Sequence, residues 1–270
     1  MQKLSGFITL TTDFGIGSSY IAAMNGVILS LYPKARIFDL FHAVPPQDIS
    51  QGAQVLEEIS VLYPPGTIHI AVVDPGVGTR REIILAQIGS QYYIAPNNGL
   101  LGRLAQQAVL KKEKTAFYSL TNQVYWRQEI SNTFHGRDIM APVAAHLLNG
   151  IKPEELGVPI DEIVYPSIPE PVADENSISG IVERIDSFGN LITNITLSAL
   201  KDRPLHDTVK ITISGVYETT GVYRTYADQP VGTLTAIIDS SDHLEIAIVN
   251  GNAAEMLMSK TGEPVVMKWE

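Results

Sequence analysis

The chain has 270 residues, of which 45% are hydrophobic and 18% charged, and its formal net charge is −10. This balance is typical of a folded globular protein with one large or two ordinary domains. The acidic excess argues against nucleic acid as a partner, because phosphate binding requires a basic surface. The sequence contains no cysteine, which excludes disulfides, thiolate metal sites and cysteine nucleophiles. With no apolar run of membrane-spanning length and no signal-type N-terminus, we expect a cytoplasmic protein without a membrane partner.

The first eighty residues predict alternating strands and helices. Short apolar runs at 6–10, 36–40 and from 68 onward are typical of strands, and helical spacing of apolar residues follows at about 20–31 and 49–62. Such a β-α-β-α-β order predicts a mainly parallel sheet with flanking helices.

Each of these three strands brings an aspartate near its carboxyl end: Asp13, Asp39 and Asp74. Ligands bind beyond the carboxyl ends of strands in open α/β sheets. A single aspartate there is more often a turn former or a helix cap, but three at one edge favour a site. Asp39 is the weakest candidate, because it lies within its strand.

The segment after Asp74 predicts a hairpin over 82–88 and 91–95, a helix from about Leu100, and a second helix over 139–148. Asp138 is a natural cap for that last helix. His135 precedes it in a glycine-containing loop. A histidine bonded to a backbone carbonyl is at least as common in such a loop as a catalytic one.

Four prolines between Leu156 and Asp174 indicate a linker, so we expect an α/β domain over residues 1–165 and a second domain over 174–270. Beyond the linker, short strand patterns at 178–185, 191–195, 209–213, 233–238 and 243–248 predict an all-β barrel or sandwich. Its turn at 185–190 is a hairpin turn or an adenine site, since it holds Phe188 for stacking and the Asn190 amide.

The residues support one chemical arrangement better than others. Phosphate-loop, dinucleotide-binding and metalloprotease motifs are absent, and no two candidate ligands have the spacing of a metal site on one element. Arg81 can fold back over a glycine turn to pair with Asp74, or can simply balance the charge of the turn. If His135 comes alongside, it can orient or deprotonate a water.

Taken together, five segments resemble the S-adenosylmethionine hydroxide adenosyltransferase family, whose members are S-adenosylmethionine hydrolases related to fluorinase and chlorinase. The resemblance spans nearly the whole chain in the same order. It rests on T-T-D-F-G at 11–15, V-V-D-P-G-V-G-T-R-R at 72–81, A-P-N-N-G-L-L at 95–101, T-F-H-G-R-D at 133–138 and I-D-S-F-G-N-L-I-T-N-I at 185–195.

This resemblance implies an α/β domain followed by an all-β barrel, in a homotrimer whose sites lie between subunits. It implies nucleophilic displacement by water at the ribose 5′ carbon of S-adenosylmethionine, giving adenosine and L-methionine, with no cofactor or metal. The catalytic residues would be Asp74, Arg81 and His135. The implied substrate contacts are Asp13 (ribose), Phe188 and Asn190 (adenine), Asp186 (methionine amine), Ser240 (methionine carboxylate) and Ala253 (backbone near adenine).

Two alternatives remain open at this stage. One is a protein that senses S-adenosylmethionine or adenosine with negligible turnover. The other is a chloride-dependent 5′-halogenase, because chlorinase is similar to this chain at Gly136.

Overall fold

The computed structural model describes residues 3–166, 169–201, 203–205 and 208–269. The chain divides into two compact units, Met1–Ser167 and Ile168–Glu270, each with its own buried core. In the part of the chain that the structure describes, no helix has the length and apolar character needed to cross a lipid bilayer.

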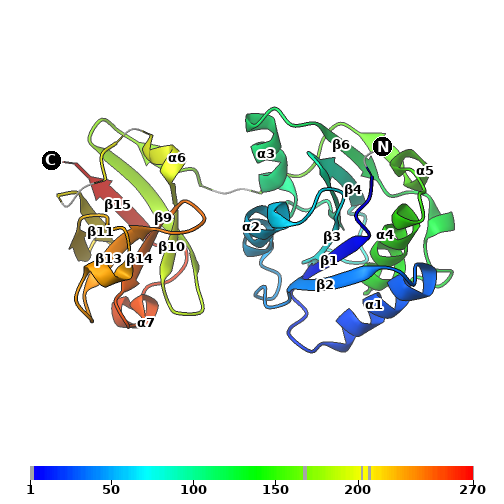
Figure 1. The fold of residues 1–270 in the computed structure, drawn as a ribbon, viewed down its shortest axis with the longest axis horizontal. Coiled ribbons are helices and arrows are strands. Elements are labelled where there is room, and N and C mark those ends of the chain that lie inside the picture. The colour runs from blue at the N-terminus through cyan, green and yellow to red at the C-terminus, as the bar shows by residue number, and fades with distance from the viewer. Residues whose placement is uncertain (1–2, 167–168, 202, 206–207, 270) are drawn as a thin grey trace. The chain divides into compact units, whose positions relative to one another are not determined.

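The first unit is built on a seven-stranded sheet in the order β2-β1-β3-β5-β4-β6-β7 (Figure 1). The strands are β1 (Phe7–Thr12), β2 (Arg36–Phe41), β3 (Ile68–Val72), β4 (Ile83–Ile88), β5 (Gln91–Pro96), β6 (Thr115–Ser119) and β7 (Val158–Ile160).

Strand direction in this sheet is mixed. The predicted parallel pairing is present for β2, β1, β3 and β5. However, β4 pairs antiparallel with both β5 and β6, and β7 pairs antiparallel with β6. The predicted 82–95 hairpin is confirmed as β4 and β5, and it is the element that breaks the parallel order.

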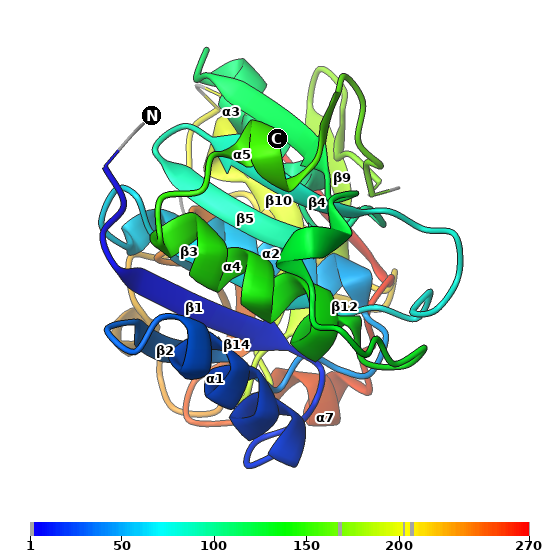
Figure 2. The ribbon, with the colours of Figure 1, turned by 90° about the vertical axis from the view of Figure 1, so that its right-hand side faces the viewer.

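Helices cover both faces of the sheet, which explains why its central strands β1, β3 and β5 are buried along nearly their whole length. Helices α1 (Ser19–Leu31) and α4 (Ala141–Leu148) pack together on one face, and α2 (Ile49–Ile59) and α3 (Gly102–Leu110) on the other (Figures 1 and 2). The remaining helical segments are the 3₁₀-helices η1 (Ser60–Leu62) and η2 (Gln123–Tyr125), the π-helix η3 (Gly136–Met140) and the short helix α5 (Pro153–Leu156).

The second unit is a curled antiparallel sheet in the order β12-β11-β15-β9-β10-β14-β13, with β8 added beside β9. Its strands are β8 (Val172–Ala173), β9 (Ser177–Ile185), β10 (Leu191–Thr196), β11 (Lys210–Ile213), β12 (Tyr217–Thr220), β13 (Leu234–Ile238), β14 (His243–Ile248) and β15 (Pro264–Lys268). The other helical segments are α6 (Leu197–Leu200), the 3₁₀-helix η4 (Tyr226–Asp228) and α7 (Ala253–Leu257).

The two ends of this sheet approach each other, so that it is a nearly closed barrel. The hydroxyl of Thr219 in β12 donates to the carbonyl of Leu234 in β13 at 2.8 Å. Just beyond β12, the Tyr223 amide donates to the Ala236 carbonyl at 2.8 Å. These bonds occupy part of the hydrogen-bonding capacity that an open edge would expose.

Candidate active site

The path of the chain after β3 explains why Asp74 and Arg81 meet. In the sheet, β5 lies between β3 and β4, and β4 runs opposite to β3. The loop from Val73 to Glu82 therefore stays at one edge of the sheet and crosses the end of β5. The Asn98 side chain, which follows β5, donates to the Val73 carbonyl at 2.9 Å and fixes the start of this loop.

Asp74 and Arg81 form a fork-like ion pair. Nε of Arg81 lies 2.8 Å from Oδ1 and 2.9 Å from Oδ2 of Asp74, and Nη2 of Arg81 also donates to Oδ2. Only 4% of the Asp74 side chain and 11% of the Arg81 side chain are exposed. The predicted pairing is confirmed, and both groups are held in one geometry in a partly dehydrated place.

Gly78 brings a second loop against this pair. Its φ of +78° is a left-handed conformation, and a Cβ there would overlap the carbonyl oxygen of Asn132. Only glycine allows this close approach without strain. The loop that carries His135 is thus packed directly against the loop that carries Arg81.

His135 contacts the guanidinium rather than the carboxylate, since its Nδ1 lies 3.0 Å from Nη2 of Arg81. A guanidinium can only donate hydrogen bonds, so Nδ1 must be the acceptor. The neutral imidazole therefore carries its proton on Nε2.

The surroundings of His135 favour this neutral form. Burial lowers the pKa of His135, and the positive charge of Arg81 lowers it further, while Asp74 and Asp138 partly oppose both effects. The ring is therefore neutral over a wider pH range than a free histidine would be.

Asp13 follows β1 at the same edge of the sheet. Its Oδ2 accepts a hydrogen bond from the backbone amide of Gln47 at 2.9 Å. The next residue, Phe14, has its ring 5.9 Å from the ring of Phe134, which directly precedes His135. The structure therefore brings the Asp13 loop beside the loop of the catalytic candidates.

An aromatic group in this region was missed by the sequence analysis. The ring of Tyr20 lies 5.4 Å from that of Phe14 and 5.0 Å from that of Phe134, and the Arg137 guanidinium lies 4.9 Å from the Phe134 ring. Tyr20 lies in the first turn of α1, and 54% of it is exposed. Phe134 is more than a hundred positions from Phe14 and Tyr20 in the sequence, so no local pattern shows that its ring meets theirs.

The predicted role of Asp138 as a helix cap is wrong. Asp138 lies inside the π-helix η3, is 0% exposed, and binds the guanidinium groups of Arg127 and Arg137 at 2.7 Å. The ion pairs with Arg127 and Arg137 stabilise Asp138 inside the π-helix, although aspartate ordinarily favours the start of a helix.

In the second unit, Asp186 organises the turn between β9 and β10. Its Oδ1 accepts from the backbone amides of Phe188 at 2.9 Å and Asn190 at 2.8 Å, and its Oδ2 accepts from the Asn190 side chain at 3.1 Å. The turn projects the Phe188 ring, which is 75% exposed, whereas Asn190 is buried. An exposed ring beside a fixed amide suits the stacking and pairing of a planar heterocycle.

Ala253 lies close to this turn, and Ser240 lies in the turn between β13 and β14. The amide of Ala254 donates to the carbonyl of Gly189 at 2.9 Å, which joins the start of α7 to the turn. Ser240 lies in the exposed turn before β14, whose His243 end pairs with Thr196 at the far end of β10. The structure thus joins Ala253 to the 186–190 turn and places Ser240 in a different turn of the barrel.

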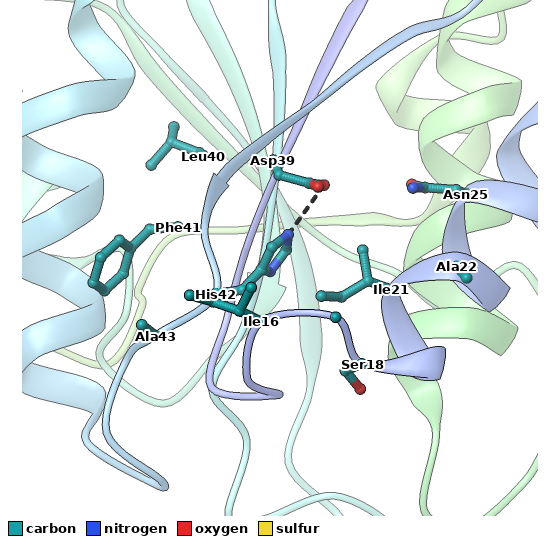
Figure 3. Close-up of a pocket in the computed structure, with 11 residues that line it drawn as sticks. Ile16, Ser18, Ile21, Ala22, Asn25, Asp39, Leu40, Phe41, His42 and Ala43 are labelled. Carbon is teal, nitrogen blue, oxygen red and sulfur yellow. Dashed lines mark ion pairs between the residues drawn. The ribbon is translucent and has the colours of Figure 1, made fainter.

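A cavity of about 490 Å³ lies between α1 and the end of β2. Figure 3 shows the imidazole of His42 facing Asp39, with Oδ1 of Asp39 3.1 Å from Nε2 of His42. His42 is also held by the Thr12 hydroxyl, 2.9 Å from Nδ1. The lining of this cavity does not include Asp74, Arg81 or His135.

The arrangement of donors and acceptors in this cluster is suited to orienting a small polar molecule. Among the residues that the structure describes, no three His, Asp or Glu side chains come together as metal ligands. The Asp74–Arg81–His135 cluster combines a proton acceptor, a fixed cation and an imidazole Nε2–H donor, which together can orient a small polar molecule.

The fold and this cluster define a two-domain protein, with a polar cluster at the strand ends of its α/β unit and an exposed aromatic ring on a turn of its barrel. The chain belongs to the S-adenosylmethionine hydroxide adenosyltransferase family. The model of that family's N-terminal domain matches residues 8–157, and the model of its C-terminal domain matches residues 180–266.

Several relatives are similar over nearly their whole length. The chain is 34% identical to a protein of Salinispora arenicola named (R)-S-adenosyl-L-methionine hydrolase, over 95% of both chains. It is 35% identical to a protein of the same name from Thermus thermophilus, over 94% of this chain and 96% of that one. A fluorinase of Nocardia brasiliensis is 28% identical, over 97% and 96%.

Among solved structures, an uncharacterized conserved protein from Thermotoga maritima superposes with a TM-score of 0.88 at 33% identity. The match covers 97% of this chain and 100% of that one.

Proposed function

We propose that this protein hydrolyses S-adenosylmethionine to adenosine and L-methionine. The observation that carries this proposal is the partly buried Asp74–Arg81–His135 cluster at the strand ends of a chain that matches named hydrolases over nearly its full length. The reaction is a nucleophilic substitution in which water attacks the ribose 5′ carbon.

The chemistry places few demands on the protein besides geometry. An oxygen lone pair of water forms the new bond to C5′, the C5′–S bond breaks, and its electron pair returns to sulfur. The leaving group is neutral methionine, so no developing anion needs to be stabilised, and one proton is released from the water. The principal demands are in-line placement and an oriented, partly dehydrated nucleophile.

Within this scheme His135 orients the water and does not deprotonate it. Its Nδ1 already accepts from Arg81, so the neutral ring can offer only an Nε2–H donor. Asp74 is the better proton acceptor, because a carboxylate has lone pairs beyond those bound by Arg81. Arg81 fixes both partners at once.

Substrate contacts follow the same logic. Asp13 offers its carboxylate to the ribose hydroxyls, while its bond to the Gln47 amide holds it in place. Phe188 stacks on adenine, the Asn190 amide pairs with it, and Ala253 contributes a backbone contact beside it.

Asp186 and Ser240 complete the proposed contacts, to the methionine amine and carboxylate respectively. Asp186 already accepts three N–H donors within its own turn, which leaves it one acceptor position for the amine.

We further propose that the protein needs no cofactor or metal, and that it works in the cytoplasm as a homotrimer. In that assembly the α/β unit of one subunit and the barrel of the next would share each site.

The test is to incubate purified protein with S-adenosylmethionine and to follow adenosine and methionine by chromatography. We expect Asp74→Asn and His135→Ala to lower turnover by about a hundredfold or more, because each removes one contact to the water. Adenosine binding, measured by calorimetry, should change little.

Asp161→Asn is the matched control, since Asp161 is an exposed carboxylate of the same unit. Adenosine formation no faster than the uncatalysed rate would reject hydrolysis and favour a binding protein. A parallel incubation with chloride, in which 5′-chloroadenosine replaces adenosine, would identify a halogenase instead.

A further inference from the structure

The carboxylate of Asp138 is a buried charge surrounded by donors. Its Oδ1 accepts from Arg127 Nη1 and from Arg137 Nε, both at 2.7 Å. Its Oδ2 accepts from Arg137 Nη2 at 2.9 Å and from the Ser131 amide at 2.8 Å. A charge buried in this way is tolerated only when it is paired and hydrogen-bonded, and here all four bonds are present.

These bonds close a loop around His135. Arg127 is at the start of the segment, Ser131 is in its middle and Arg137 is near its end. The backbone reinforces the closure, because the Arg127 amide donates to the Asp138 carbonyl at 2.9 Å and the Asp138 amide donates to the Phe134 carbonyl at 3.1 Å. Asp138 is therefore the common anchor of the loop that carries His135.

The π-helix that follows His135 supports a functional role for this segment. His135 immediately precedes the π-helix η3, and Asp138 lies at its centre. π-Turns are uncommon, cost stability relative to a continuous α-helix, and occur frequently at functional sites. The four bonds to Asp138 offset that cost at this position.

The electrostatic surroundings of Asp138 keep it ionised. Burial acts to raise the pKa of Asp138, but the hydrogen bonds from Arg137, Ser131 and Arg127 together outweigh burial and lower it. The charged groups that act on His135 are Arg81, Asp74 and Asp138. Asp138 therefore stays a fixed negative charge near the ring.

We propose that Asp138 is a positioning residue for catalysis. By tying Arg127, Ser131 and Arg137 to the π-turn, it holds the His135 ring with Nδ1 on Arg81 and the Nε2–H free to orient the attacking water. The proposal rests on the proposed hydrolysis, in which His135 orients that water.

The first test compares Asp138→Asn with Glu129→Gln, which removes a negative charge from an exposed position of the same loop. We expect Asp138→Asn to lower kcat roughly tenfold to a hundredfold with KM within about twofold, because a small misplacement near the reacting atoms is costly. The acid limb of its pH–rate profile should move to lower pH, since a charge that favours imidazolium is lost. Glu129→Gln should change neither quantity.

The second test does not depend on turnover. The ¹⁵N chemical shifts of His135 report which ring nitrogen carries the proton. We expect a single Nε2–H tautomer in the wild type and a mixture in Asp138→Asn. If the wild-type protein forms no adenosine, the proposed hydrolysis fails, while these spectra still decide the role of Asp138.

If Asp138→Asn does not fold, Arg127→Gln tests the same proposal. It removes one hydrogen bond to Asp138, and because the Arg127 side chain is 40% exposed, its loss should perturb the fold less. A folded variant with kcat within twofold of wild type, or with unchanged His135 spectra, overturns the proposal.

Discussion

Gly78 is the residue on which the close packing of the Arg81 loop against the His135 loop depends. Its left-handed backbone turns the 73–82 loop, and its missing side chain leaves space for the Asn132 carbonyl. Both properties are particular to glycine, and they act together at this position. The backbones at Gly78 and Asn132 are therefore in direct contact, and this contact brings Arg81 and His135 within hydrogen-bonding distance.

Gly78→Ala should therefore reduce activity more than stability. We expect the free energy of unfolding to fall by about 1–3 kcal/mol from backbone strain. Turnover should fall at least tenfold, because displacing Asn132 moves the His135 loop away from Arg81. Urea unfolding and adenosine release measure the two effects.

Gly150→Ala separates strain from displacement. Gly150 has a φ of +92° in the same unit, but a Cβ there would meet nothing within 4 Å. It should lose about 1 kcal/mol of stability and keep its turnover. Equal turnover losses in the two variants would contradict the proposed role of the loop contact.

The contacts of some single residues could be predicted from the sequence, and those of others could not. The Asp74–Arg81 pair was predictable, because a glycine turn seven residues long returns the chain to its start. Asp138 was not, because aspartate before an apolar helical run resembles a cap. Its real partners, Arg127 and Arg137, are recognisable only once the π-turn has formed.

At the scale of elements, β3 buries an ionisable ring. His69 is 0% exposed, its Nδ1 lies 2.7 Å from the Thr9 hydroxyl, and its ring stacks on Tyr93 at 4.9 Å. Burial lowers the pKa of His69 to about 3, against an opposing hydrogen bond with Gln91. The folded state therefore favours the neutral form of His69, and protonation of this ring should destabilise the fold around β3.

This gives β3 a predictable response to acid. The unfolded chain binds a proton at His69 near pH 6.5, whereas the folded chain binds it near pH 3. The stabilisation is complete above about pH 6.5 and is lost as the pH falls toward 3, at up to about 1.4 kcal/mol per pH unit. Urea unfolding at several pH values should show a shallower loss in His69→Gln than in the wild type. Identical slopes would mean that His69 does not control the acid response.

Elements were predicted best where periodicity was strong. The N-terminal β-α-β-α-β order and the 82–95 hairpin are present as expected. By contrast, β12 and β15 were missed, because they are short and their pairing in the sheet is decided by distant strands. Strand β7 lies within the proline-rich segment that predicted only a linker, since an edge strand tolerates proline.

At the scale of the whole molecule, each unit has a core of its own. Separate buried clusters fill the two faces of the first sheet and the interior of the barrel. The proposed catalytic residues belong to the first unit, and the proposed adenine contacts belong to the second. We therefore predict that each unit folds independently, and that hydrolysis requires both units.

Expressing residues 1–167 and 168–270 separately tests this division. We expect each piece to unfold cooperatively by circular dichroism, because each retains its core. Neither piece alone should release adenosine from S-adenosylmethionine. Hydrolysis by the first piece at the full-length rate would show that the barrel is not needed for catalysis.

The reversed strand β4 has a consequence for how this protein can vary. Every proposed reacting group of the first unit lies at the edge where β1 and β3 end and β4 begins, while the Gly89–Ser90 turn lies at the opposite edge. Residues inserted in that turn would lie far from Asp74, Arg81 and His135. Residues inserted between β3 and β4 would lie in the loop that carries Asp74 and Arg81. We therefore expect inserted residues to be tolerated in the Gly89–Ser90 turn and to abolish turnover in the loop between β3 and β4.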